Sequence, residues 1–155
     1  MKEVVINKRF GGYNVSHEAS IDIFKYDNNV DKVYIYSAEN YESDKCKLIK
    51  DIKFNNGEFD NDIDDYVTYI SSKYLGDNIN RNEIKLDCVK FMLSLTQNIK
   101  REDKRLIELI KEWGSERCSG NYSELKIVEI PDDVEYEIDD YDGCESIHEK
   151  HRIWE

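Results

Sequence analysis

Hydrophobic and polar residues recur with two different periods along this chain, and together they predict an α+β fold. Short runs rich in β-branched and aromatic residues have the composition of strands, and several alternate apolar and polar positions as a half-buried strand does. These runs are residues 3–7, 32–37, 46–54, 66–71, 125–130 and 134–138. Because short turn segments join many of them, we expect a largely antiparallel sheet.

One segment has the period of an amphipathic helix. Between Asp103 and about Arg117, apolar residues recur at i, i+3, i+4 and i+7, and Asp103 is placed to cap the first turn. The apolar positions are Leu106, Leu109, Ile110 and Trp113, with Ile107 widening the face. This is the one main helix that we expect.

One or two shorter helices are expected elsewhere. Ser16 is a plausible N-cap for a short helix through Glu18 and Ala19. A weaker apolar stripe of Val89, Met92 and Leu93 suggests another. Turns are predicted at residues 8–13, 55–57 and 142–143, and the last residues, 147–154, form a short terminal element. No linker or repeat divides the chain, so residues 1–155 are expected to form a single ligand-binding domain.

The composition limits the partners that this chain can have. It carries 22 Lys and Arg against 34 Asp and Glu, for a formal net charge of −12. Such a surface disfavours binding to nucleic acid and to anionic membranes, although a few placed cations can still hold a compact anion. No signal peptide opens the sequence and no apolar run approaches the roughly 20 residues of a membrane span, so we expect a cytoplasmic protein.

Catalytic and metal-binding signatures are missing from the sequence. Cys46, Cys88, Cys118 and Cys144 are far apart, so we interpret them as ordinary reduced thiols, and the three His form no recognisable metal set. No nucleophile elbow or Cys-His pattern appears. The sequence therefore predicts neither an enzyme nor a bound cofactor or metal.

The first candidate ligand site is the glycine turn KRFGGYNVS. Backbone N–H groups of Gly11 and Gly12, ahead of a helix, can bind a phosphate, and Arg9 adds positive charge. Phe10 and Tyr13 offer faces on which a base can stack. The alternative is that this segment is only a tight turn at the end of a sheet.

Two further groups of cations are candidates. Arg101 to Arg105 lie at the start of the main helix, where cations oppose the helix dipole unless a ligand phosphate, Glu102, Asp103 or a partner carboxylate compensates them, and the alternative is a solvated face. In the C-terminal tail KHRIW, Arg152 can fork onto an anion and Trp154 can stack. Alternatively, the tail packs on its own sheet, with Trp154 in the core and Arg152 against Asp139 or Asp140.

Several segments together resemble a family of small bacteriophage proteins. They are VVINKRFGGYNVSHEA, YVTYISSKYLG, REDKRLIELIKEWG and the C-terminal stretch from LKIVEIPDD to HRIW. Within that group the chain is similar to Thoeris anti-defence proteins of the first type. Residues 21–65 match nothing in the family, and the amino-acid sequence of the glycine turn, RFGGYNVS, departs somewhat from the family's usual pattern.

The resemblance implies a function and a set of residues. Members of this family are sponges that sequester the cyclic ADP-ribose signal of a bacterial TIR-domain enzyme without cleaving it, and they are homodimers or larger homo-oligomers that work in the host cytoplasm. The ligand-binding residues carried over are the glycine turn, Arg101, Asn121 and Arg152, to which the chemistry of the ligand adds Arg9 and Trp154. Two rival hypotheses remain: an acidic DNA mimic or protein–protein inhibitor of a host defence enzyme, and a nucleotide-cleaving enzyme.

Overall fold

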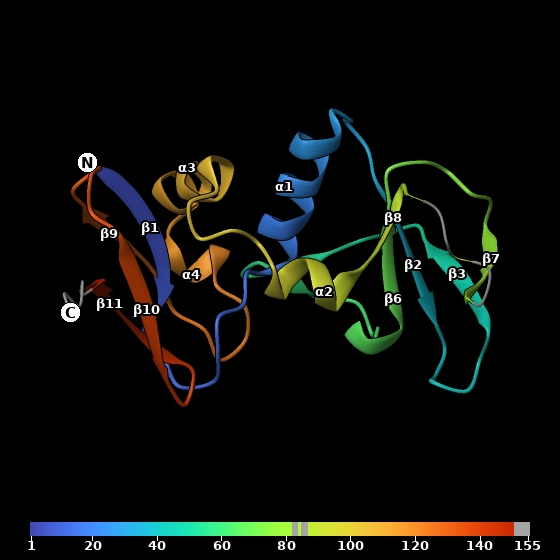
Figure 1. Ribbon diagram of the computed structural model, residues 1–155. Helices are drawn as coiled ribbons and strands as arrows, with labels where there is room; N and C mark the ends of the chain where they lie inside the picture. Colours follow the sequence, from blue (N-terminus) through green and yellow to red (C-terminus); the bar gives the residue numbers. More distant parts are fainter. Residues whose placement is uncertain (82–83, 85–86, 151–155) are drawn as a thin grey trace, which may run out of the picture.

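The computed structural model describes residues 1–81, 84 and 87–150, and it confirms an α+β fold in which every strand pair is antiparallel. Figure 1 shows two groups of strands with helices between them. On one side, β1 (Lys2–Asn7) pairs with β9 (Leu125–Ile130), and β10 (Tyr136–Tyr141) pairs with β11 (Cys144–Glu149).

The other side of the molecule is a five-stranded sheet in the order β7-β3-β2-β6-β8. Its strands are β2 (Tyr34–Ala38), β3 (Lys45–Ile49), β6 (Thr68–Ser71), β7 (Asn78–Asn80) and β8 (Val89–Phe91). The expected strand at 46–54 is interrupted after Ile49, and its end forms β4 (Phe54–Asn55). The hairpin turn predicted at 55–57 is confirmed, because β4 pairs with β5 (Glu58–Phe59).

The helices differ from the expected pattern of one main helix. α1 (His17–Asn28) has 12 residues and is longer than α3 (Lys104–Trp113), which has 10. Ser16 caps α1 by accepting a hydrogen bond from Ala19 N, as predicted, but the helix continues well past Ala19. A sequence prediction that stopped at the first turn missed Ile21, Ile23 and Phe24, which are buried in α1.

The helix predicted from Asp103 to Arg117 is divided in two. Asp103 caps α3 as expected, but α3 ends at Trp113, and after Gly114 a single turn, α4 (Ser115–Cys118), continues the chain in a new direction. Gly114 has a φ of 90°, which breaks the helix. The short helix predicted from Val89, Met92 and Leu93 is confirmed only in part. Val89 lies in β8, and the helix α2 (Met92–Gln97) begins three residues later.

The remaining predicted segments are shifted by a few residues. The run at 66–71 starts as a 3₁₀ turn, η1 (Asp65–Val67), before β6, and the run at 134–138 becomes β10. The turn at Asp142 and Gly143 is confirmed between β10 and β11. The terminal element expected at 147–154 is the end of β11 as far as Glu149, and residues 151–154 lie outside the described residues.

The main hydrophobic core lies between the two groups of strands. It joins Val5 of β1 with Ile23 of α1, Ile70 of β6 and Leu106 of α3, all at most 1% exposed. Burying each such side chain stabilises the fold by about 2 kcal/mol. A smaller cluster of Tyr36, Ala38, Cys46 and Val67 covers the other face of the five-stranded sheet. Among the described residues, no helix combines the length and the apolar content needed to cross a membrane.

Candidate functional site

The glycine turn packs against the turn between β10 and β11. Gly11 N–H donates to Asp142 O at 3.1 Å, so this amide is already bonded within the protein. A Cβ atom added to Gly143 would lie 2.2 Å from Gly12 N, which shows how closely the two backbones approach. The geometry therefore agrees with the alternative of a tight turn, in which the glycines serve packing between backbones.

Arg101 is held by the protein itself. Its guanidinium forms a bidentate ion pair with Glu145, at 2.5 Å and 2.7 Å, and Glu145 is only 4% exposed. The carboxylate also accepts from Asn7 N–H at 2.7 Å. The guanidinium carbon lies 3.5 Å from the centre of the Tyr13 ring. We call Arg101, Glu145, Asn7 and Tyr13 the arginine clamp.

Tyr13 closes the arginine clamp on its other side. Its hydroxyl donates to Ile99 O at 3.0 Å. Burial raises the pKa of Tyr13 well above its usual value, and the positive charge of Arg101 opposes this only in part. The ring is thus half-buried, neutral and stacked on a guanidinium, and the clamp ties the N-terminal segment to the start of α3 and to β11.

The second predicted group of cations is also neutralised. Arg105 donates from Nε to Asp22 Oδ1 at 2.7 Å and from Nη1 to Glu108 at 3.2 Å. These carboxylates, one from α1 and one from the same helix, compensate a cation near the helix start. Asp22 and Glu108 take this role for Arg105, and not Glu102 or Asp103, which the sequence suggested.

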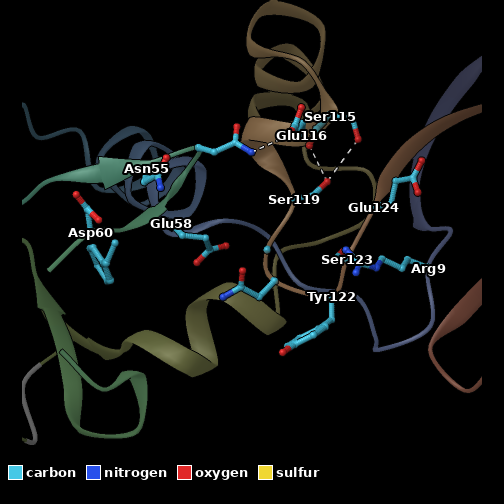
Figure 2. Close-up of a pocket in the computed structure, with 14 residues that line it drawn as sticks. Arg9, Asn55, Glu58, Asp60, Ser115, Glu116, Ser119, Tyr122, Ser123 and Glu124 are labelled. Carbon is cyan, nitrogen blue, oxygen red and sulfur yellow. Dashed lines mark hydrogen bonds between the residues drawn. The ribbon is translucent and has the colours of Figure 1, made fainter. Parts of the chain in front are cut away.

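Arg9 and Asn121 are brought together, although 112 positions separate them in the chain. Both line a cavity of about 630 Å³ between the segments 55–60 and 115–124. In Figure 2, Arg9 and Glu58 lie on opposite sides of this space, with Tyr122 at its edge. The Arg9 guanidinium lies 5.9 Å from the centre of the Tyr122 ring, and no carboxylate of the described residues forms an ion pair with it. We call this the Arg9 pocket.

The charge of the Arg9 pocket is negative apart from Arg9. Four carboxylates line it: Glu58, Asp60, Glu116 and Glu124. Glu116 accepts a hydrogen bond from Asn56 Nδ2 at 3.0 Å, across the pocket wall. An anionic group is therefore attracted only close to Arg9, while hydroxyl and amino groups find acceptors around the rest of the rim.

The other predicted residues do not line this pocket. Phe10 is 61% exposed and packs edge-on against Tyr141, with ring centres 6.2 Å apart. Gly11, Gly12, Tyr13 and Arg101 belong to the packed turn and the arginine clamp described above. Arg152 and Trp154 lie outside the described residues.

A second cavity, of about 660 Å³, adjoins the Arg9 pocket and shares Glu58, Phe59 and Asn121 with it. Its floor holds His17, which is 7% exposed. Nδ1 lies 2.6 Å from Glu58 and Nε2 lies 2.8 Å from Asp65, and the ring stacks on Phe59 at 4.1 Å. No sequence pattern indicates this cluster, because its three titratable groups come from α1, β5 and η1.

His17 is charged at neutral pH. Burial by itself would lower the pKa of His17, but the hydrogen bonds to Asp65 and Glu58 outweigh it and raise the pKa to about 9. The protonated ring donates from both nitrogens to the two carboxylates. Above that pKa, Nδ1 is free to accept from Phe59 N–H, 3.0 Å away. One oxygen of Glu58, Oε1, is buried without a hydrogen-bond partner.

The four cysteines lie in different parts of the fold. All four cysteines are described, and each is a free thiol. Burial raises the pKa of Cys118 to about 12, which makes it a poor nucleophile. Within the described ranges, no group of three or more His, Cys, Asp or Glu side chains has an arrangement that holds a metal ion.

Comparison of the chain with protein-family models, with curated proteins and with solved structures finds no match to any of them. The resemblance to the anti-defence family thus stays a prediction that rests on the quoted sequence segments. The Arg9 pocket is the part of the structure where two of the predicted ligand-binding residues meet.

Proposed function

We propose that this chain is a binding protein without catalytic activity that sequesters a cyclic ADP-ribose-type nucleotide. The observation that carries the proposal is the meeting of Arg9 and Asn121 in one pocket. Both residues were expected to bind ligand, and they come from opposite ends of the chain. The pocket volume of about 630 Å³ lies within the range of roughly 300–1,000 Å³ typical of small-molecule sites.

Each group in the pocket has a role that suits such a ligand. The unpaired Arg9 guanidinium forks onto a phosphate oxygen pair, and the Tyr122 ring, 70% exposed, offers a stacking face to adenine. Asn121 supplies an amide that both donates and accepts. Glu116 and Glu124, which are exposed, accept from ribose hydroxyls, which explains carboxylates in a nucleotide site better than phosphate contacts do.

Isothermal titration with cyclic ADP-ribose tests this proposal. We expect saturable binding that Arg9→Gln weakens about tenfold, as loss of one charge-assisted hydrogen bond predicts. Lys126→Gln is the matched control, because it removes the same charge from an exposed position of β9 outside the pocket. Mass spectrometry of the released ligand should return the intact mass. Absence of binding, equal weakening by Lys126→Gln or a hydrolysed product would overturn the proposal.

The oligomeric part of the proposal needs its own measurement. A sponge of this kind is expected to be a homodimer or larger, and the exposed pair Phe10 and Tyr141 is an apolar patch available for self-association. Light scattering coupled to size exclusion should give at least twice the chain mass of 18.4 kDa. A monomer at all concentrations would contradict the oligomeric assignment while leaving ligand binding untouched.

A second function, an acidic inhibitor of a basic partner protein, is favoured by a different observation. Arg101 and Arg105 are neutralised internally, whereas several carboxylates of the two adjoining cavities, among them Asp60, Asp62 and Glu116, are exposed. Asp60→Lys separates the two functions, because its side chain has no ion-pair partner among the described residues and lines the Arg9 pocket. The substitution should strengthen binding of cyclic ADP-ribose and weaken binding of a lysine-rich peptide. A parent chain that binds the lysine-rich peptide but not cyclic ADP-ribose, with its affinity for the peptide lowered by Asp60→Lys, would favour the inhibitor.

A further inference from the structure

A third kind of pocket lies at the far end of the five-stranded sheet. It has a volume of about 590 Å³ and is formed where β2 begins and β3 ends, with Tyr74 from the loop after β6. Except for Tyr74, its lining comes from residues 32–52, in the part of the chain that resembles nothing in the anti-defence family. We call it the Tyr34 pocket.

The floor and one wall of the Tyr34 pocket are apolar and aromatic. Val33, Ile49 and Ile52 are only partly buried, and they pack on the main core with one side while lining the pocket with the other. Tyr34 and Tyr74 stand together, with ring centres 5.6 Å apart and planes tilted by 55°. Such a surface suits a flat ring, because every base has a face that can stack on an aromatic side chain.

The charged residues that line the Tyr34 pocket are both lysines. No carboxylate is among its lining residues, in contrast to the Arg9 pocket and its neighbour. Lys32 Nζ lies 5.4 Å from the centre of the Tyr34 ring. In a chain with a net charge of −12, Lys32 has no ion-pair partner among the described residues and gives the rim of this pocket a positive charge, whereas the charge of Lys50 is partly offset by Asp77.

Asp77 holds one side of this pocket in place from outside the lining. Its Oδ2 lies 3.2 Å from Lys50 Nζ, and its Oδ1 accepts from the Tyr74 hydroxyl at 2.7 Å. One carboxylate thus fixes both a cation and an aromatic ring. Because the two groups are positioned before any ligand arrives, less side-chain entropy is lost on binding.

We propose that the Tyr34 pocket binds a small planar aromatic anion, of about the size of a nucleoside monophosphate. The ring stacks on Tyr34 or Tyr74 above the floor of Val33, Ile49 and Ile52, and the anionic group lies between Lys32 and Lys50. The site goes beyond the proposed function, because it shares no residue with the Arg9 pocket and does not require cyclic ADP-ribose to bind there.

The experiment uses the full chain labelled with ¹⁵N and three probes: AMP, adenosine and inorganic phosphate. We expect AMP to shift the amide signals of residues 32–35, 48–52 and 74 in a saturable way. Adenosine should bind more weakly at the same signals, and phosphate alone should leave them unchanged, since ring and charge contribute together. Saturable shifts confined to Arg9 and residues 121–124 would overturn this inference while supporting the proposed function.

Variants distinguish the effect of Lys32 and Lys50 on AMP binding from the effect of the protein's overall charge. Lys32→Gln with Lys50→Gln should weaken AMP binding by roughly tenfold or more, as loss of at least one charge-assisted contact predicts. Lys47→Gln is the matched control, because Lys47 is exposed on β3 and lies outside the pocket lining. Equal weakening by the control, or unchanged affinity in the double variant, would refute the site. Circular dichroism of each variant establishes that the fold is retained.

Discussion

Arg101 and Glu145 face each other through two parallel hydrogen bonds, although 44 positions separate them in the chain. Glu145 is almost fully buried, and the Arg101 side chain is 26% exposed. A buried carboxylate is costly unless it is paired, so this pair makes the position of β11 depend on the segment before α3. Arg101 therefore has a structural task, whatever it contributes to a ligand.

Breaking this pair from one side should destabilise the protein strongly. Arg101→Met leaves the Glu145 carboxylate buried without its cation, and we expect a loss of about 3 kcal/mol in the free energy of unfolding. Urea denaturation followed by circular dichroism measures it. Glu145→Gln in the Arg101→Met background should recover part of the loss, because it removes the unpaired charge.

The control for the arginine clamp is an exposed ion pair. Lys111 Nζ lies 2.7 Å from Glu3, with the lysine side chain 58% exposed. Lys111→Met should change stability by less than about 1 kcal/mol, as is usual for surface pairs. Equal effects of Arg101→Met and Lys111→Met would mean that burial does not strengthen the clamp.

Substitution by alanine should destabilise the protein to different extents at two glycines that have nearly the same φ. Gly143 has a φ of 91° and Gly114 a φ of 90°, so both substitutions place a side chain at a positive φ that L residues rarely adopt, at a cost on the order of 1–3 kcal/mol. A Cβ on Gly143 would also meet Gly12 N at 2.2 Å, whereas nothing lies within 4 Å of one on Gly114. Thermal melts should therefore show a clearly larger loss for Gly143→Ala. Equal losses would show that the turn at Gly143 is not packed closely against the glycine turn.

The stability of the protein should fall at alkaline pH because of His17. Its pKa is raised to about 9 in the folded state, so the stabilisation is complete below the usual His value near 6.5 and is lost as pH rises through about 9. Melting temperatures between pH 6 and 10 measure this. His17→Gln should be less stable at pH 6 and show a flatter profile in that window. His148→Gln serves as control, because His148 is exposed, and its profile should follow that of the parent chain.

The cap of α3 gives a prediction of smaller size. The Asp103 side chain accepts from Leu106 N–H at 2.8 Å, and its loss in Asp103→Ala should cost about 1 kcal/mol. Asp103→Asn keeps an oxygen in the same place and should retain most of the stability. Chemical denaturation of the two variants compares them, and an equally damaged Asn variant would mean that charge rather than capping is responsible.

Local signals in the sequence were sufficient for much of the secondary structure. The caps at Ser16 and Asp103, the turn at Gly143 and the strands around Val4 and Ile127 all depend on neighbours a few residues away. The end of α3 was predicted too late because the apolar period continues up to the break, and Gly114 alone decides where the helix stops.

The candidate site was harder to predict, because its properties depend on distant partners. Arg9 and Asn121 were expected to act together, and they do line one pocket. Arg101 looked equally suited to a ligand, but no pattern within the segment 101–105 indicates that Glu145 neutralises it. The cluster of His17, Glu58 and Asp65 was missed for the same reason, since His17 precedes the two carboxylates by 41 and 48 positions.

The pairing of β1 with β9 has a consequence for how the chain folds. Lys2 lies opposite Ile130 and Asn7 opposite Leu125. During synthesis, β1 is therefore made more than a hundred residues before its partner strand β9. Contacts of such high sequence separation slow folding, because a long loop must close before they form. The five-stranded sheet has its strands within residues 34–91 and needs no such wait. We therefore expect that sheet to assemble first during synthesis, with the Arg9 pocket completed only when the C-terminal third of the chain has been made.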